Sequence, residues 1–395
     1  MLAAAQPALA EPRTTAYQPI IVDPAAERRT IILNGHDLTI DDVIAVARHG
    51  AKVRFAPGLA ELSQARVDLT EQGNEEGMAI YGRNRGGGAL REKPNTPQPG
   101  MNSAGSDARH GGLPEIQEEE LVRAFLVIQA NHFAYGMISG PYMQAMIDLI
   151  NARVTPAMYA RGTLTEGDLF VFNNYQATLR GRGFAYYKGV RMPAGEALAK
   201  AGLKPFTGEM ALLTTNAYTN AIALLLVDEG RQALEWADLT LAIDLLGMNS
   251  SITPLVPPVQ ARRPFPWVNW EASKLLEVLR GSYLFEDDKD RILQDPESLR
   301  ASHIRLGSAW QAWATLRDSV TLQMNSGESN PGQFLDAKPS DHWSLATPWL
   351  MRNHVRGGPL SHGRSGYVLS NANWDAYPMI NDVEAFNLAL ANMAV

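Results

Sequence analysis

Residues 209–248 constrain the fold of this chain more than any other part of the sequence. They contain no proline, and only Gly230 and Gly247 interrupt their helical pattern. One helix of that length would span ~60 Å, whereas a compact chain of 395 residues has a radius of gyration of only ~21 Å. We therefore expect a mainly α fold, an elongated bundle of long helices that associates with copies of itself. The apolar residues that occupy more than one face of this helix are Ala221, Leu224, Ala233, Ala237, Leu241 and Leu245.

Helical periodicity also marks residues 118–131, 142–153, 270–283 and 301–324. Before them, residues 29–48 predict a short strand, a turn at Asn34-Gly35 and a helix capped by Thr39 with acids in its first turn. The sequence thus predicts a small N-terminal α/β region followed by a helical bundle. Prolines and glycines predict long loops at 81–112, 251–267 and 330–368.

The sequence pattern divides the chain into three parts. Residues 1–28 are expected to be a flexible N-terminus, 29–113 the α/β region with its lid loop, and 114–395 the bundle. Residues 1–12, MLAAAQPALAEP, end like a signal-peptidase site but lack a basic n-region. A plain terminus and a shortened export signal, which would make the protein exported or periplasmic, therefore stay open as alternatives.

The composition excludes several classes of protein. The 35 Lys and Arg residues against 42 Asp and Glu give a net charge of −7, which leaves no basic surplus for a nucleic acid partner. The absence of cysteine removes thiolate nucleophiles and cysteine-bound metals. The histidines are never spaced i, i+4 on one helix, so no metal site is predicted. The longest strongly apolar run, residues 221–227, is far shorter than the ~18 residues of a membrane span.

Several short segments, taken in order, carry a resemblance to a known family. They are LNGHDLTIDDVIAVAR (33–48), YGRNRGGG (81–88), LINARVTP (149–156), GTLTEGDL (162–169), GEALAKAGLKP (195–205), QDPESLR (294–300), MNSGESNP (324–331) and LSNANW (369–374). Together they resemble the aromatic amino acid lyase family, the histidine and phenylalanine ammonia-lyases, over residues 31–395. One such match means little, but the whole series in order is specific.

The resemblance implies an ammonia-lyase-like fold, a homotetramer whose active site is assembled from three subunits, a small-molecule carboxylate substrate and a cytoplasmic location. The family's electrophile, methylidene-imidazolone, forms when an Ala-Ser-Gly tripeptide cyclises and its serine loses water. Thr165, Glu166 and Gly167 stand at that place here, and glutamate has no β-hydroxyl to lose. We therefore expect neither this group nor any other cofactor. The chain also ends at Val395, where family members continue with a further helical segment.

The same resemblance assigns site residues. Tyr81 matches the family's catalytic base, and Gln294 and Arg300 keep the pair that orients the substrate and binds its carboxylate. A guanidinium forked onto a carboxylate is a good geometric anchor. Glu297 replaces a family tyrosine and is a candidate for a second acid. Further substrate-binding positions are Asn84, His110 and Trp374.

Two interpretations of residues 165–168 stay open. Thr165 or Asp168 could cap a helix that begins in the apolar run 169–172, with Glu166 in its first turn. Alternatively, Glu166 is a catalytic acid in the place of the electrophile. With Glu297 close to it in a partly dry cavity, one of the two carboxyl groups would stay protonated and serve acid–base chemistry.

Two functions follow from these residues. The first is an enzyme that performs elimination, addition or cyclisation by acid–base chemistry on an aromatic or related carboxylate, without the electrophile. The second is a catalytically inactive protein of the lyase fold that binds a small molecule or partners an active lyase. Tyr81, Gln294 and Arg300 favour the enzyme, whereas the three glycines at 86–88 and the missing C-terminal segment favour the inactive protein.

Overall fold

The computed structural model describes residues 16–95, 112–161, 168, 171–211, 213 and 215–393. The chain forms two compact units, each built from two stretches of sequence. Unit 1 comprises Met1–Tyr218 and Gly327–Trp374, and unit 2 comprises Thr219–Ser326 and Asp375–Val395. The three-part division expected from the sequence follows sequence pattern rather than packing, and it stays a prediction.

Unit 1 begins with a parallel pair of strands. β1 (Thr30–Leu33) pairs with β2 (Lys52–Phe55), and α1 (Ile40–Ala47) connects them. The Thr39 hydroxyl accepts a hydrogen bond from the backbone N–H of Asp42, and the Asp42 carboxylate accepts one from the backbone N–H of Thr39. This capping box satisfies two N–H groups that the helix itself leaves unbonded. The predicted N-terminal α/β region and its capped helix are confirmed.

The core of unit 1 is helical. Its central helices are α3 (Glu119–His132), α4 (Gly140–Asn151) and α5 (Val171–Leu179). The fully buried guanidinium of Arg123 donates hydrogen bonds to the carbonyl oxygens of Val46 and Ile150, so it ties α3 to α1 and α4. Around this core lie α2 (Leu59–Glu75), β3 (Gly112–Glu115), β4 (Val154–Pro156), β5 (Tyr159–Arg161), β6 (Phe184–Tyr187), β7 (Val190–Pro193) and α6 (Ala194–Lys200).

Residues 330–368, expected to be a long loop, contain strands. β8 (Gly332–Leu335), β9 (His354–Val355) and β10 (Gly366–Leu369) form an antiparallel sheet in the order β8-β10-β9. Val355 and Val368 pack with Leu69 of α2 in a small apolar cluster. The expectation was wrong because burial against a helix far away in the sequence decides that these short segments pair, and local composition does not reveal that burial.

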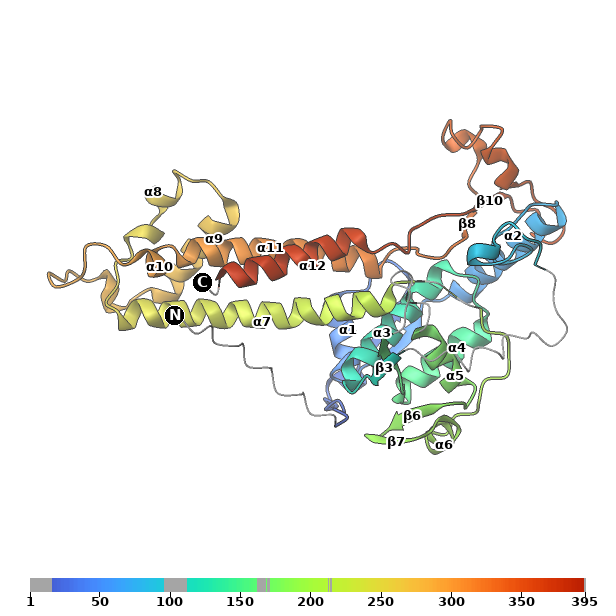
Figure 1. Cartoon of the computed structure of the whole chain (residues 1–395), viewed down its shortest axis with the longest axis horizontal. Helices are drawn as coiled ribbons and strands as arrows, with labels where there is room; N and C mark the ends of the chain where they lie inside the picture. The colour runs from blue at the N-terminus through green and yellow to red at the C-terminus, as the bar shows by residue number, and fades with distance from the viewer. Residues whose placement is uncertain are drawn as a thin grey trace, which may run out of the picture. The chain divides into compact units, whose positions relative to one another are not determined.

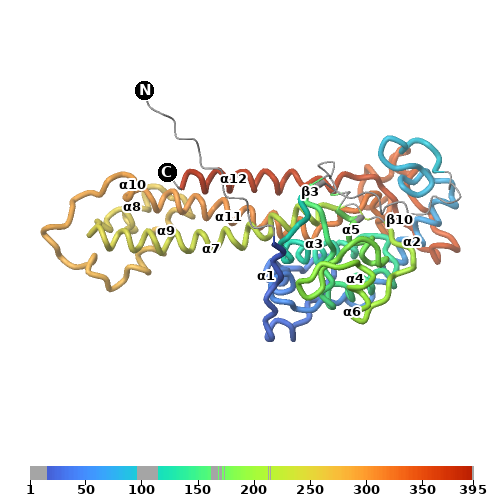
Figure 2. The backbone as a smooth tube through the Cα atoms, turned by 60° about the horizontal axis from the view of Figure 1, so that its bottom comes forward, coloured from blue at the N-terminus to red at the C-terminus, as the bar shows by residue number. Residues whose placement is uncertain are grey.

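The long helices of unit 2 run alongside one another (Figure 1, Figure 2). They are α7 (Ala217–Gly247), whose first two residues belong to unit 1, α9 (Pro266–Leu279), α11 (Ser302–Met324) and α12 (Tyr377–Met393). The Trp313 indole donates a hydrogen bond of 2.8 Å to the carbonyl oxygen of Val227. Phe386 lies so close to Gly230 that a Cβ there would come within 2.7 Å of its ring. The glycine inside the long helix therefore permits close packing of α12 on α7.

The sequence predicted that the long helix begins at residue 209. In the structure it begins at Ala217. The described residues between 209 and 216 are not helical. The backbone N–H of Asn216 donates to the carboxylate of Glu328, and that of Tyr218 donates to the carboxylate of Asp168. Carboxylates from distant segments thus fix a start that helix propensity alone leaves open. In the described part of the chain, no helix is both long and apolar enough to cross a bilayer.

Candidate active site

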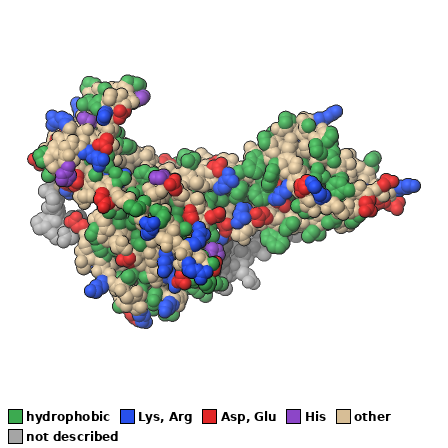
Figure 3. Space-filling model, turned by 180° about the vertical axis from the view of Figure 1, so that it is seen from behind, with side chains coloured by type: hydrophobic (Ala, Val, Ile, Leu, Met, Phe, Trp, Pro, Cys, Tyr) green, Lys and Arg blue, Asp and Glu red, His purple; other side chains and the backbone are tan. Residues whose placement is uncertain are grey.

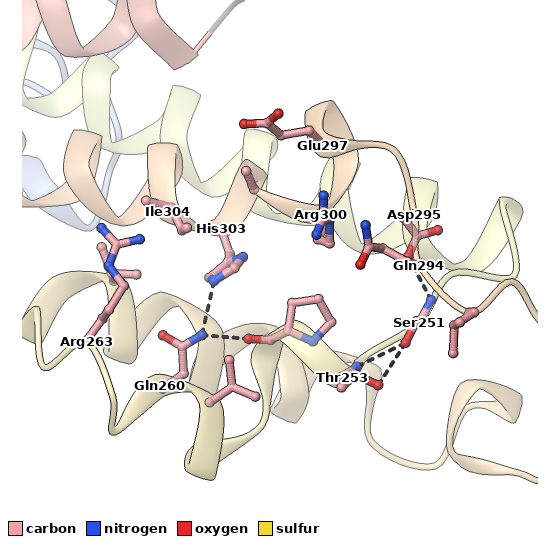
Figure 4. A pocket seen from close by; sticks show the side chains of 15 residues that line it. Ser251, Thr253, Gln260, Arg263, Gln294, Asp295, Glu297, Arg300, His303 and Ile304 are labelled. Carbon is pink, nitrogen blue, oxygen red and sulfur yellow. Dashed lines mark hydrogen bonds between the residues drawn. The ribbon is translucent and has the colours of Figure 1, made fainter.

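A cavity of about 610 Å³ lies within unit 2 (Figure 4). One wall is the connection from α7 to α9, which contains η5 (Thr253–Leu255) and α8 (Pro257–Gln260). The other wall is the segment around α10 (Glu297–Arg300) that leads into α11. The structure therefore brings together three of the predicted site residues, Gln294, Glu297 and Arg300.

A tight turn presents these three residues. The buried carboxylate of Asp295 accepts a hydrogen bond of 2.9 Å from the backbone N–H of Ser251, which fixes the start of the turn against the opposite wall. Pro296 then begins the single helical turn of α10, and its carbonyl oxygen accepts a bond of 3.0 Å from the N–H of Arg300. Gln294 thus lies just before this turn, and Arg300 lies at its end.

Arg300 is the group in this cavity best placed to bind an anion. Its Nε atom is buried and has no hydrogen-bond partner among the residues that the structure describes. Figure 4 shows the side chains of Arg300 and Gln294 next to each other, whereas the carboxylate of Glu297 is turned away on the other side of α10. A buried donor without a partner is unfavourable, so a ligand that accepts its hydrogen bond would be stabilised here.

The predicted base, Tyr81, lies in unit 1, in the segment that follows α2. Its hydroxyl oxygen accepts a hydrogen bond of 2.9 Å from the backbone N–H of Gly88. Within the described ranges, no group accepts the hydroxyl hydrogen of Tyr81. Its role as the base stays a prediction. The nearby guanidinium of Arg83 is already paired with Glu71, at 2.6 Å.

Asn84, predicted to contact substrate, holds the same segment together. Its amide nitrogen donates to Asn74 at 2.6 Å and to the carbonyl oxygen of Met78 at 2.7 Å. Its amide oxygen accepts from the backbone N–H of Ile80 at 2.7 Å. Both amide hydrogens are therefore used within the segment, and only a lone pair of the oxygen is left for a ligand. Its role in substrate binding stays a prediction.

Trp374 is half-buried at the end of the second stretch of unit 1. The segment before it is tied to residues 327–330. The backbone N–H of Asn371 donates to the side-chain oxygen of Asn330 at 3.0 Å, and the Asn373 amide donates to the carbonyl oxygen of Gly327 at 3.1 Å. Two of the segments that carry the family resemblance are thus neighbours in space.

Glu166, His110 and Thr165 lie outside the described residues. Asp168 is described, is buried, and bonds the N–H of Tyr218 at 3.1 Å. Its side chain therefore caps α7. That Asp168 caps the helix that follows it in sequence stays a prediction. Burial and the charge of Asp168 raise the pKa of Tyr218 to about 12.

Sequence reasoning missed a second buried pair at the start of α7. The carboxylate of Glu328 bonds the N–H of Asn216 and lies 3.7 Å from Nδ1 of His132. Both side chains are almost completely buried, at 0% and 1% exposure. The available signal was a titratable residue inside an apolar helix, His132 next to Phe133.

Two further polar residues of the cavity were also missed, Gln260 and His303. They bond each other across the cavity at 3.1 Å, between their Nε2 atoms. Burial lowers the pKa of His303, and the charge of Arg263 lowers it further. No local pattern could have found this pair, because the two residues are 43 positions apart.

Comparison with known proteins decides the family. The profile of the family described as "Aromatic amino acid lyase" matches residues 38–395. The chain belongs to the aromatic amino acid lyase family. The resemblance carried by the short segments is therefore confirmed.

Histidine ammonia-lyases are among the similar members of the aromatic amino acid lyase family. The enzyme of Stigmatella aurantiaca is 30% identical over 323 residues, which cover 79% of this chain and 63% of that enzyme. The enzyme of Myxococcus xanthus is 31% identical over 327 residues, with the same two coverages of 79% and 63%. The chain thus spans less than two thirds of the length of these curated relatives.

Solved structures of the aromatic amino acid lyase family share the fold. An ergothionase from Treponema denticola superposes with a TM-score of 0.76 at 24% identity, over 92% of this chain and 69% of that one. A phenylalanine aminomutase from Pantoea agglomerans gives a TM-score of 0.75 at 18% identity, over 93% and 71%. The predicted mainly α, ammonia-lyase-like fold is confirmed.

Proposed function

We propose that this protein is an enzyme of the aromatic amino acid lyase family that acts on an aromatic or related carboxylate. The observation that carries the proposal is the buried, unpartnered Nε of Arg300 beside Gln294, at the wall of a cavity of about 610 Å³. Cavities of ~300 to 1,000 Å³ are typical of small-molecule sites. Apolar side chains on both walls, Val259, Val268 and Ile304, suit the body of such a ligand.

In the proposed reaction, elimination, addition or cyclisation proceeds by acid–base chemistry. Arg300 binds the carboxylate through two parallel N–H bonds, and Gln294 orients it. Tyr81 removes or returns the proton, and the N–H of Gly88 supports the negative charge on its oxygen in the phenolate form. Glu166 is the acid of the proposed reaction. The carboxylate of Glu297 is turned away from Arg300. This orientation argues against Glu297 as a second acid and agrees with Arg300 as the anchor.

No step of the proposed reaction uses methylidene-imidazolone. The group requires a residue with a β-hydroxyl between two small residues, and Glu166 stands between Thr165 and Gly167. The residues present therefore do not fit the group. In this proposal the protonated carboxyl group of Glu166 takes the place of the electrophile and donates a proton at the reacting centre.

We further propose a homotetramer in which the cavity of one chain is completed by the Tyr81 segment of a neighbouring copy. The support is an apolar stripe on the unit 2 part of α7, defined by Ile222, Trp236, Leu239 and Ile243. These residues are 46%, 71%, 46% and 67% exposed. Consecutive members of the stripe are 14, 3 and 4 residues apart, which places them on one face of the helix. Figure 3 shows exposed hydrophobic side chains on the helical unit, among charged ones. An exposed apolar stripe is expected on a face that another subunit covers.

Thermal unfolding in the presence of aromatic carboxylates, beginning with trans-cinnamate, tests this function. A ligand at one hundred times its dissociation constant should stabilise the protein by about 2.7 kcal/mol. The Arg300→Ala variant should lose this shift, whereas Arg262→Ala, which removes an exposed arginine outside the cavity lining, should keep it. If no carboxylate stabilises the wild type, the carboxylate site is wrong. Binding without any turnover would favour the inactive lyase-fold protein instead.

A further inference from the structure

The Gln260–His303 pair lies beside the proposed carboxylate anchor and has no part in the function proposed above. His303 is 4% exposed and occupies the first turn of α11, three residues after Arg300. Gln260 is 9% exposed and ends α8 on the opposite wall. Figure 4 shows the two side chains meeting across the cavity. They connect the wall that carries Arg300 to the wall that faces it.

The carbonyl oxygen of Pro254 determines the direction of the hydrogen bonds. It lies 2.7 Å from Nε2 of Gln260 and can only accept, so the amide nitrogen of Gln260 must face it. The second hydrogen of the same amide then points to Nε2 of His303, at 3.1 Å. That ring nitrogen must be the acceptor. His303 is therefore neutral, with its proton on Nδ1.

The proton on Nδ1 serves the backbone of Arg300, to which the His303 ring is hydrogen-bonded. The result is a continuous chain of bonds: Gln260 donates to Pro254 and to His303, and His303 donates to the carbonyl oxygen of Arg300. Protonation of His303 would add a hydrogen to its Nε2 atom, which would then face the N–H of Gln260, and the hydrogen bond between them would be lost. The charged groups that line the same cavity are Arg263, Arg300, Asp295 and Glu297.

We propose that Gln260 and His303 are positioning residues that hold the α10 turn, and with it the guanidinium of Arg300, in the orientation that binds a carboxylate. The inference rests on the proposed function. It adds that His303 acts on the ligand through Arg300 and not by contact of its own. A neutral imidazole also leaves Arg300 as the cation nearest the Gln294 end of the cavity, so the site takes a monocarboxylate with an apolar body.

Three substitutions of His303 separate the two bonds. His303→Leu removes both. His303→Asn keeps a donor near the position of Nδ1, and His303→Gln keeps an acceptor near the position of Nε2. We expect His303→Leu to weaken trans-cinnamate binding about tenfold, measured by calorimetry. Gln260→Ala should weaken it by a similar factor, and His303→Asn should recover most of the affinity.

The decisive measurement is the effect of His303→Leu in an Arg300→Ala background. If His303 acts through Arg300, its removal changes the residual affinity less than twofold there. An equal loss of affinity in both backgrounds would mean that His303 only supports the fold, and would overturn the proposal. Affinity within twofold of wild type for His303→Leu alone would overturn it as well.

Two measurements without ligand test the positioning role independently of the proposed function. Crystal structures of wild type and His303→Leu should show the Arg300 guanidinium ordered in the first and displaced in the second. ¹⁵N spectra of histidine-labelled protein should show His303 with its proton on Nδ1 at pH 7. If trans-cinnamate does not bind the wild type but both of these results hold, the proposed function fails and the positioning of Arg300 stands. An unmoved Arg300 in His303→Leu would reject the positioning role.

Discussion

The carboxyl group of Glu271 on α9 lies against the carboxyl group of Asp238 on α7 in the interior of unit 2. The two residues are 0% and 2% exposed. Asp238 is ion-paired with Lys274 and accepts the indole N–H of Trp310 at 3.2 Å. Glu271 has no such donor, and neither of its carboxyl oxygens has a hydrogen-bond partner among the residues that the structure describes. Burial raises the pKa of Glu271 to about 8, and the charge of Asp238 adds to the rise.

This pair predicts a pH-dependent stability. Because the pKa of Glu271 is raised in the folded protein, its stabilising effect is fully present below pH 4.5 and is lost as the pH rises through about 8. Glu271→Gln should therefore become more stable than wild type as the pH rises, by up to about 1.4 kcal/mol per pH unit in this window. Chemical denaturation at pH 5, 6.5 and 8 measures the difference. Glu277→Gln, an exposed change on the same helix, is the control, and parallel profiles for both variants would contradict the prediction.

We expect that the protein does not form methylidene-imidazolone, because Glu166 has no β-hydroxyl to lose. The mass of the purified protein should therefore equal the mass calculated from its sequence. Mass spectrometry that found two waters fewer would show that the group forms in spite of the glutamate. Incubation with histidine, phenylalanine or tyrosine should accordingly release no product with the ultraviolet absorbance of a cinnamate.

Tyr81→Phe should lower kcat about a hundredfold or more with little change in carboxylate binding, because only the proton-transfer group is lost. The phenyl ring keeps the packing of the segment, and only the bond from Gly88 disappears. Steady-state kinetics with a substrate found by ligand screening measures the effect, with Tyr377→Phe, an exposed tyrosine of unit 2, as the control. Full turnover by both Tyr81→Phe and Glu166→Gln would mean that the chemistry occurs elsewhere.

The apolar stripe on α7 predicts the assembly state. Replacing Trp236 and Ile243 together by lysine should dissociate the oligomer, because two charges would enter a face that another subunit covers. Light scattering at micromolar concentration should then report a smaller species than the wild-type tetramer. Met248→Lys makes the same chemical change at an exposed residue just beyond α7 and should leave the mass unchanged. A wild-type monomer would reject both the tetramer and the composite site.

The site was partly predictable, because Gln294, Glu297 and Arg300 lie within one turn and their spacing alone brings them to one cavity. Orientation was not predictable. Both Arg300 and Glu297 line the cavity, but the carboxylate of Glu297, the candidate second acid, is turned away from Arg300, the candidate anchor. Asn84 illustrates the same limit, since its sequence position matches the family and yet three bonds within its own segment occupy its amide.

The sequence by itself determined the family, because the short motifs occur in the family's order. It also determined the helical segments and the Thr39 cap, because these depend on contacts within a few residues along the chain. Only the tertiary structure decided where α7 begins and what holds Arg300. Asn216 meets Glu328 across 112 positions, Tyr218 meets Asp168 across 50, and Gln260 meets His303 across 43. A buried N–H must find an acceptor, but which distant side chain supplies it is settled only when the segments pack together.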